Sequence, residues 1–103
     1  MKIIFNKKWL QELAEGKQSG KKRFSKEVID QYRNRILYIS EAKNTKELRE
    51  IKSFHFERLT GDKLGLYSIR VTKKYRIEFM ITKEGNIVIE EVVVVENLSN
   101  HYK

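Results

Sequence analysis

A pair of strand patterns joined by a three-residue turn constrains the fold more than any other feature of the sequence. Apolar and aromatic side chains occupy alternate positions on both sides of residues 72–74, namely Tyr67, Ile69, Val71, Tyr75, Ile77, Phe79 and Ile81. The positions between them are mostly polar or charged, with Met80 as the exception. A period of two is typical of a strand that buries one face and exposes the other. The pattern therefore predicts an antiparallel hairpin.

The register of this hairpin places two arginines opposite each other. Facing residues must have equal parity if the apolar set is to share one face, and the simplest register pairs Val71 with Tyr75. Arg70 then faces Arg76 across the ladder. Like charges at opposed positions destabilise a sheet by roughly 0.2–1 kcal/mol. Two interpretations follow: either Glu78 and solvent screen the pair, or the open face of the sheet binds an anion.

Helical patterns precede the hairpin. A short strand is expected at Lys2–Phe5, and Asn6 is expected to cap a helix that ends at Gly16. Apolar residues at spacings of three and four predict an amphipathic helix from about Lys21 to Ala42. Asn44 is expected to cap a third, shorter helix, with a glutamate three residues later.

Strand patterns follow these helices. Period-two alternation begins at Phe54, turns are expected at Gly61–Gly65 and Glu84–Asn86, and the last strand is expected over Ile87–Glu96. Four consecutive valines in that strand are typical of an interior strand with a neighbour on each side. We therefore expect one α+β domain over residues 1–103. In it, an N-terminal strand and two or three helices pack on a mostly antiparallel sheet of four to five strands.

Composition narrows the partners. The net charge of +8, from 22 Lys and Arg against 14 Asp and Glu, favours a polyanionic partner such as nucleic acid, a ribosome or an acidic protein. A solvated basic surface without a partner is the plainer interpretation. Cysteine is absent and the only histidines are His55 and His101, so we expect neither a metal site nor a cofactor. The apolar run at the N-terminus is too short for a signal peptide or membrane span, which predicts a cytoplasmic protein with no membrane partner.

Four segments, taken together and in order, resemble the RelE/HigB toxins, also called the plasmid maintenance killer protein family. They are the turn Gly61–Gly65, the strands Leu66–Val71 and Tyr75–Ile77, and the terminal Asn100–Tyr102, within a similarity that extends from Phe24 to Lys103. The resemblance implies a RelE-like fold and the toxin of a bacterial type II toxin–antitoxin pair. It further implies a ribosome-dependent mRNA endonuclease that inhibits growth. The implied partners are the ribosome, mRNA and a cognate antitoxin, with the toxin itself monomeric until it joins a larger complex with the antitoxin.

The sequence departs from the family pattern at two places. Lys63 and Leu64 stand where the family's turn commonly has Arg-Lys. Ser99 and Asn100 stand where many relatives have an Asp-Tyr pair before the histidine. Relatives can also carry a histidine on the strand before the glycine turn, and His55 is the nearest candidate for that position.

The candidate catalytic residues follow from the chemistry of RNA cleavage without metal. The 2′-hydroxyl attacks the adjacent phosphorus, a base removes its proton, an acid protonates the leaving oxygen, and cations stabilise the charge that develops. We assign His101 to proton transfer, because its ordinary pKa is about 6.5, and Arg70 and Arg76 to the scissile phosphate. Tyr102 and His55 are secondary candidates, for stacking on a base or for the other proton.

Two other functions remain open from the residues alone. The same basic face could belong to a non-catalytic RNA- or ribosome-binding module, which would block translation without cutting the message. A protein-interaction domain with no nucleic-acid role is the third alternative, and its binding would respond little to salt.

Overall fold

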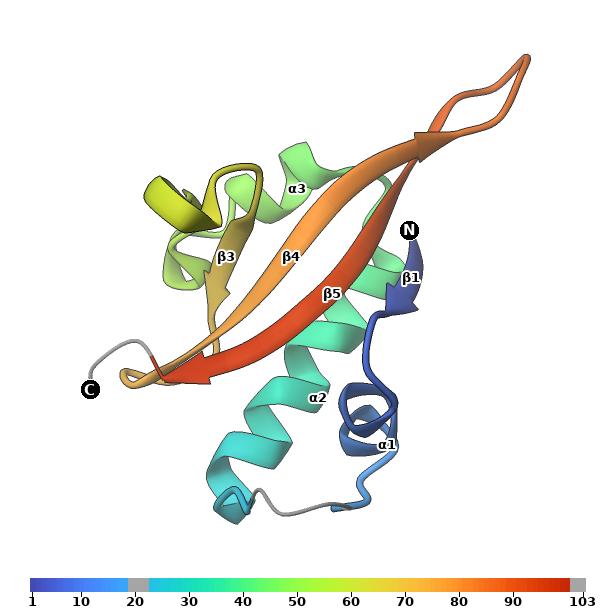
Figure 1. Cartoon of the computed structure of the whole chain (residues 1–103). Coiled ribbons are helices and arrows are strands. Elements are labelled where there is room, and N and C mark those ends of the chain that lie inside the picture. Colours follow the sequence, from blue (N-terminus) through green and yellow to red (C-terminus); the bar gives the residue numbers. More distant parts are fainter. Residues whose placement is uncertain (19–22, 101–103) are drawn as a thin grey trace.

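The computed structural model describes residues 1–18 and 23–100. The elements in chain order are β1 (Lys2–Phe5), α1 (Lys8–Ala14), α2 (Lys26–Glu41), α3 (Thr45–Arg49), the 3-10 turn η1 (Lys52–Phe54), β2 (Glu57–Arg58), the 3-10 turn η2 (Gly61–Lys63), β3 (Tyr67–Arg70), β4 (Tyr75–Glu84) and β5 (Glu90–Asn100). The strands form one five-stranded sheet in the order β1-β5-β4-β3-β2. Only β1 pairs in parallel, with β5. Helices α1 and α2 lie on one face of this sheet (Figure 1), which confirms the α+β prediction.

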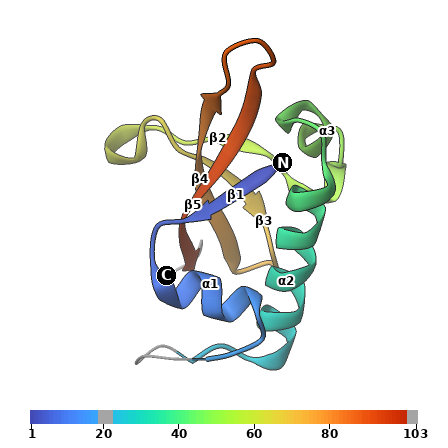
Figure 2. The same cartoon turned by 90° about the vertical axis from the view of Figure 1, so that its right-hand side faces the viewer.

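The predicted hairpin register is confirmed. Strand β3 pairs with β4 so that Arg70 faces Arg76 and Ile69 faces Ile77. The apolar set of both strands points to the helices, where Ile69, Ile77 and Phe79 are fully buried. Because side chains alternate along a strand, the polar set lies on the opposite face. Among the described residues, no helix covers that second face (Figure 2), and we call it the open face.

A bulge in β5 decides which of its residues reach the open face. Glu78 pairs with Asn97, but the next residue of β4, Phe79, pairs with Val95, so Glu96 is an extra residue on β5. An inserted residue reverses the parity of the strand beyond it. As a result Val95 packs in the core on one side of the bulge, while Asn97 is aligned with the polar set on the other.

The helices are held to the sheet by polar contacts as well as apolar packing. The Tyr32 hydroxyl of α2 donates a 2.8 Å hydrogen bond to the Leu10 carbonyl of α1. Burial raises the pKa of the Tyr32 phenol, so this group stays protonated as a donor. At the other end of α2, the Met1 ammonium donates to the carbonyls of Ile39, Ser40 and Ala42. These bonds satisfy helix-end carbonyls that lack intrahelical partners. None of the described helices has the length and apolar character needed to cross a membrane.

Two helix starts differ from the expectation. Lys7, not Asn6, precedes α1 as its cap, and the Asn6 amide instead donates to Glu96 Oε1 at 2.8 Å. Helix α2 begins at Lys26, not near Lys21, because the Ser25 hydroxyl accepts from the amide of Val28 and so satisfies a first-turn donor. The predicted cap of α3 is confirmed, since Asn44 accepts from the amide of Glu47.

Two strand boundaries also differ from the expectation. The segment beginning at Phe54 is not a strand: η1 ends there, His55 has φ of 46° in the left-handed region, and β2 starts only at Glu57. The last strand starts at Glu90, and the apolar residues 87–89 lie in an exposed hairpin tip that projects from the body (Figure 1). At Gly85 in that tip φ is +117°, and an added Cβ would collide with the Val88 carbonyl oxygen, so this turn requires glycine.

Candidate active site on the open face of the sheet

Arg76, near the start of β4, is the most enclosed cation of the open face. Its Nη1 donates to the Ser68 hydroxyl at 3.1 Å and to the His55 carbonyl at 3.3 Å. Its Nη2 lies 3.8 Å from Glu57 Oε1, and the side chain is 6% exposed. The expectation that this guanidinium points freely outward is therefore wrong. A buried cation must replace its water with protein acceptors, and these three groups surround it for that reason.

A buried carboxylate lies two residues further along β4. Glu78 Oε2 contacts Lys63 Nζ at 2.6 Å and accepts a 3.0 Å hydrogen bond from the Ser99 hydroxyl. The Glu78 side chain is 8% exposed, whereas that of Lys63 is 50% exposed. Lys63 comes from η2, so this ion pair fixes the glycine turn against the open face. The sequence showed both residues, but their pairing depends on how η2 folds back, and no local pattern encodes that.

Arg70 is the less enclosed of the two facing arginines. Its side chain is half-buried, and it makes no hydrogen bond or ion pair with residues 1–18 or 23–100. Its carbonyl accepts a 2.9 Å hydrogen bond from Nε of Arg35 on α2, which ties β3 to the helix layer. Burial lowers the pKa of Arg35, although a guanidinium keeps its charge near neutral pH. The Arg70 guanidinium therefore remains available to a ligand while its backbone is held.

The histidines and the terminal tyrosine have different standings. His55 is exposed, and its backbone carbonyl, not its imidazole, contacts Arg76. His101 and Tyr102 lie outside the described residues. Asn100, the last residue described, pairs with Tyr75, which directly precedes Arg76 in β4.

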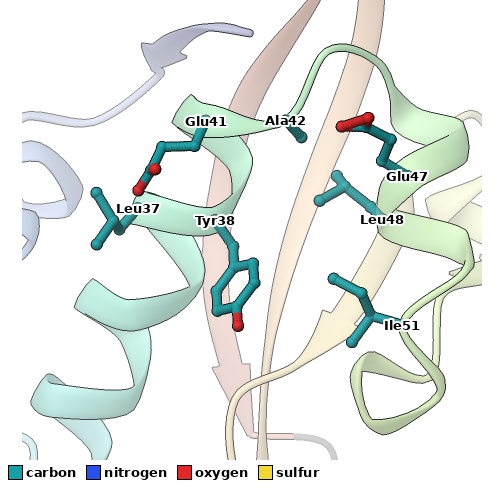
Figure 3. A pocket seen from close by; sticks show the side chains of 7 residues that line it. All are labelled: Leu37, Tyr38, Glu41, Ala42, Glu47, Leu48 and Ile51. Carbon is teal, nitrogen blue, oxygen red and sulfur yellow. The ribbon is translucent and has the colours of Figure 1, made fainter.

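A larger hollow lies elsewhere, between α2 and α3 (Figure 3). We call it the α2–α3 groove; it has a volume of about 480 Å³ and is lined by Leu37, Tyr38, Glu41, Ala42, Glu47, Leu48 and Ile51. Its walls are mostly apolar, and its two ionisable carboxylates are both acidic. Such a surface repels phosphate and offers no cation to a nucleic acid.

The open face has the chemistry that the groove lacks. Arg70, Arg76 and Lys63 provide three cations within one layer of a rigid sheet. Among residues 1–18 and 23–100, no group of three His, Asp or Glu side chains is placed to hold a metal ion. The described part of the site is therefore suited to bind an anion through guanidinium and ammonium groups.

The sequence also matches a known family. That family is described as HigB-like toxin, the RelE-like toxin of the type II toxin–antitoxin system HigB, and the match covers residues 3–95. No curated protein matches the chain.

Two solved structures have a similar fold. One is a YoeB/ParE toxin from Agrobacterium tumefaciens, with a TM-score of 0.62 and 18% sequence identity, covering 99% of this chain and 100% of that chain. The other is the YoeB-YefM complex from Staphylococcus aureus, with a TM-score of 0.58 and 15% identity, covering 99% of this chain and 98% of the matched chain. At these identities the likeness concerns the fold, whereas the family match concerns the sequence itself. The chain therefore belongs to the RelE-like toxins of type II toxin–antitoxin systems, within the HigB group.

Proposed function

We propose that this toxin inhibits growth by cutting translated mRNA on the ribosome, through attack of the RNA's own 2′-hydroxyl and without a metal ion. The observation that supports this most directly is the placement of Arg70, Arg76 and Lys63 on one uncovered face, in a chain of the RelE-like toxin family. The net charge of +8 suits a ribosome and its message as partners.

The proposed step makes and breaks one bond each. The 2′-oxygen forms a bond to the adjacent phosphorus while the bond from phosphorus to the leaving 5′-oxygen breaks. A base takes the proton of the 2′-hydroxyl, and an acid gives a proton to the 5′-oxygen. The products are a 2′,3′-cyclic phosphate and a 5′-hydroxyl. Negative charge builds on the phosphorane oxygens between these states, which is where cations accelerate the reaction.

Arg76 is suited to that charge because its guanidinium is fixed but not fully used. Two bonds from Nη1, to Ser68 and to the His55 carbonyl, hold the plane of the group. The contact of Nη2 with Glu57 is 3.8 Å, too long for a hydrogen bond, and the Glu57 side chain is 52% exposed. A phosphate oxygen can therefore displace Glu57 from Nη2 at little cost. Arg70, opposite on β3, then binds a second oxygen of the same phosphate.

The proton transfers are assigned to the chain's end. His101 is proposed as general base or acid, and it directly follows Asn100, whose pairing with Tyr75 brings the end of β5 beside Arg76. Tyr102 and His55 are proposed as second choices, for stacking on an unpaired base or for the other proton.

The second partner in this proposal is a cognate antitoxin that neutralises the toxin. The toxin is proposed to be monomeric when alone, and to act in the cytoplasm, where translation takes place.

Arg76→Lys tests the phosphate role, because it keeps the charge but loses the guanidinium fork. Induced expression with mapping of transcript ends should show cleavage reduced at least about 100-fold relative to the wild type. Since Arg76 is buried, a thermal melt must accompany the assay, and a variant of unchanged Tm and unchanged cleavage would remove Arg76 from the mechanism. His101→Gln tests the proton transfer separately, and cleavage at the wild-type rate would exclude that role.

A non-catalytic RNA- or ribosome-binding module is the second candidate function. The enclosure of Arg76 favours it, because a guanidinium held by Ser68 and His55 also has a purely structural explanation. In a translating extract a binder stops synthesis while the message stays intact, so the mapping of transcript ends separates the two functions.

A further inference from the structure

A second hollow, beside the cation cluster, is not used by the mechanism above. It lies at the end of β5 and has a volume of about 390 Å³, within the usual range of small-ligand sites. The residues that matter for its chemistry are Arg23, Phe24, Lys63, Tyr75, Asn97 and Ser99. We call it the β5 pocket.

One atom in this pocket lacks a partner. Asn97 Oδ1 is buried and accepts no hydrogen bond. Its neighbour across the strands is Glu78, whose carboxylate is an acceptor and cannot supply a proton. The nearby donors Lys63 and Ser99 are both bound to that carboxylate. An unsatisfied buried acceptor costs about 1–3 kcal/mol, so this oxygen is best explained by a donor that arrives with a ligand.

The pocket wall is suited to a flat ring. Phe24 and Tyr75 meet edge to face with ring centroids 5.6 Å apart, and Trp9 stacks behind Phe24 at 6.0 Å. Unpaired RNA bases stack on such aromatic side chains, with about 1–3 kcal/mol per base. Arg23 and Lys63 add positive charge to the same lining, which favours the phosphate attached to a base.

We propose that the β5 pocket receives an unpaired base of the message next to the cut, and that Asn97 Oδ1 accepts a hydrogen bond from an exocyclic amino group of that base. Adenine and cytosine carry this amino group, whereas guanine and uracil carry a carbonyl oxygen at the equivalent position and would repel Oδ1. The inference rests on the proposed function, in that RNA is the substrate. It adds a specificity-determining residue and a chemical class of base.

Two readouts separate this inference from the nuclease proposal. The first is cleavage of messages that differ only in the nucleotides flanking the cut, and we expect an amino-bearing base to raise the rate about 10- to 100-fold. The second is binding of AMP, CMP, GMP and UMP, followed by the fluorescence of Trp9, the chain's one tryptophan. AMP and CMP should quench it at lower concentration than GMP and UMP, whether or not the protein cuts RNA.

The key variant is Asn97→Leu, with Asn86→Leu in the exposed hairpin tip as the matched control. Asn97→Leu should abolish the preference for amino-bearing bases in both readouts, and Asn86→Leu should keep it. Asn97→Asp, which retains an acceptor oxygen, should keep part of the preference if the leucine variant does not fold. Equal quenching by all four nucleotides in the wild type, or an unchanged preference in Asn97→Leu, would overturn the inference. Absence of cleavage together with selective quenching would overturn the nuclease proposal alone.

Discussion

The two hollows of this toxin differ in chemistry more than in size. The α2–α3 groove is the larger, at about 480 Å³ against 390 Å³ for the β5 pocket. The groove is built from apolar side chains with Glu41 and Glu47 as its only charged groups (Figure 3). The β5 pocket has cations, aromatic rings and a buried acceptor without a partner. For a ligand with a phosphate backbone, the smaller hollow is the suitable one.

The same contrast exists in how the two regions contribute to stability. The groove floor is core packing, where each buried methylene stabilises the fold directly. The open face is a set of charges whose stability depends on mutual pairing, since each would be costly alone. Substitutions should therefore affect stability and cleavage in opposite proportions in the two regions.

The largest expected effect on stability is at the groove floor. Leu48 is fully buried on α3, and Leu48→Ala leaves a cavity in the core. We expect a loss of about 3 kcal/mol in the free energy of unfolding, and a fall in Tm of about 10–20 °C. Denaturant melts measure the first and calorimetry the second. Cleavage per folded molecule should not change, and a loss of cleavage beyond the loss of folded protein would contradict the separation of the two regions.

A smaller effect is expected in the charge cluster. Lys63→Met leaves the buried Glu78 carboxylate with Ser99 as its remaining partner, at an expected cost of about 2 kcal/mol. Replacing both residues, Lys63→Met with Glu78→Leu, should cost about 1 kcal/mol less than the sum of the two single substitutions. Additive costs in urea melts would show that the pair is not coupled.

A pH-dependent effect is expected where α3 meets the sheet. Glu91 accepts hydrogen bonds from the backbone amide and the hydroxyl of Thr45, both at 2.8 Å, and these bonds lower the pKa of the Glu91 carboxyl. Its stabilisation is therefore present above the unfolded pKa and is lost as the pH falls through the lower folded pKa. Glu91→Gln should cost about 1 kcal/mol at neutral pH, and its difference from the wild type should shrink in melts at acid pH. A constant difference down to the acid range would contradict this linkage.

The parts of the fold that follow from local periodicity could be predicted from the sequence. Parity along two strands is enough to place Arg70 opposite Arg76, because side chains alternate and a hairpin fixes the register. The four valines predicted an interior strand for the same reason, and β5 does lie between β1 and β4.

The parts that depend on the chain folding back could not be predicted in this way. Arg76 is enclosed because a left-handed residue at His55 turns a carbonyl toward it, and no sequence period signals that turn. The bulge at Glu96 brings Asn97 to the open face, and runs of similar residues on β5 conceal the shift. The apolar residues 87–89 have strand composition, but they lie beyond the body of the sheet, where no neighbour covers them.

The smallest expected effect is at the groove rim. Leu37 has the same side chain as Leu48 but is 56% exposed, so its truncation or replacement removes little buried surface. Leu37→Gln should change the free energy of unfolding by no more than about 0.5 kcal/mol, as measured by urea melts beside Leu48→Ala. It should also leave cleavage and Trp9 quenching by AMP unchanged, because the groove has no cation with which to hold RNA. A Leu37→Gln protein that folds normally but cuts RNA more slowly would place part of the substrate in the groove, and the chemical distinction between the two hollows would then be wrong.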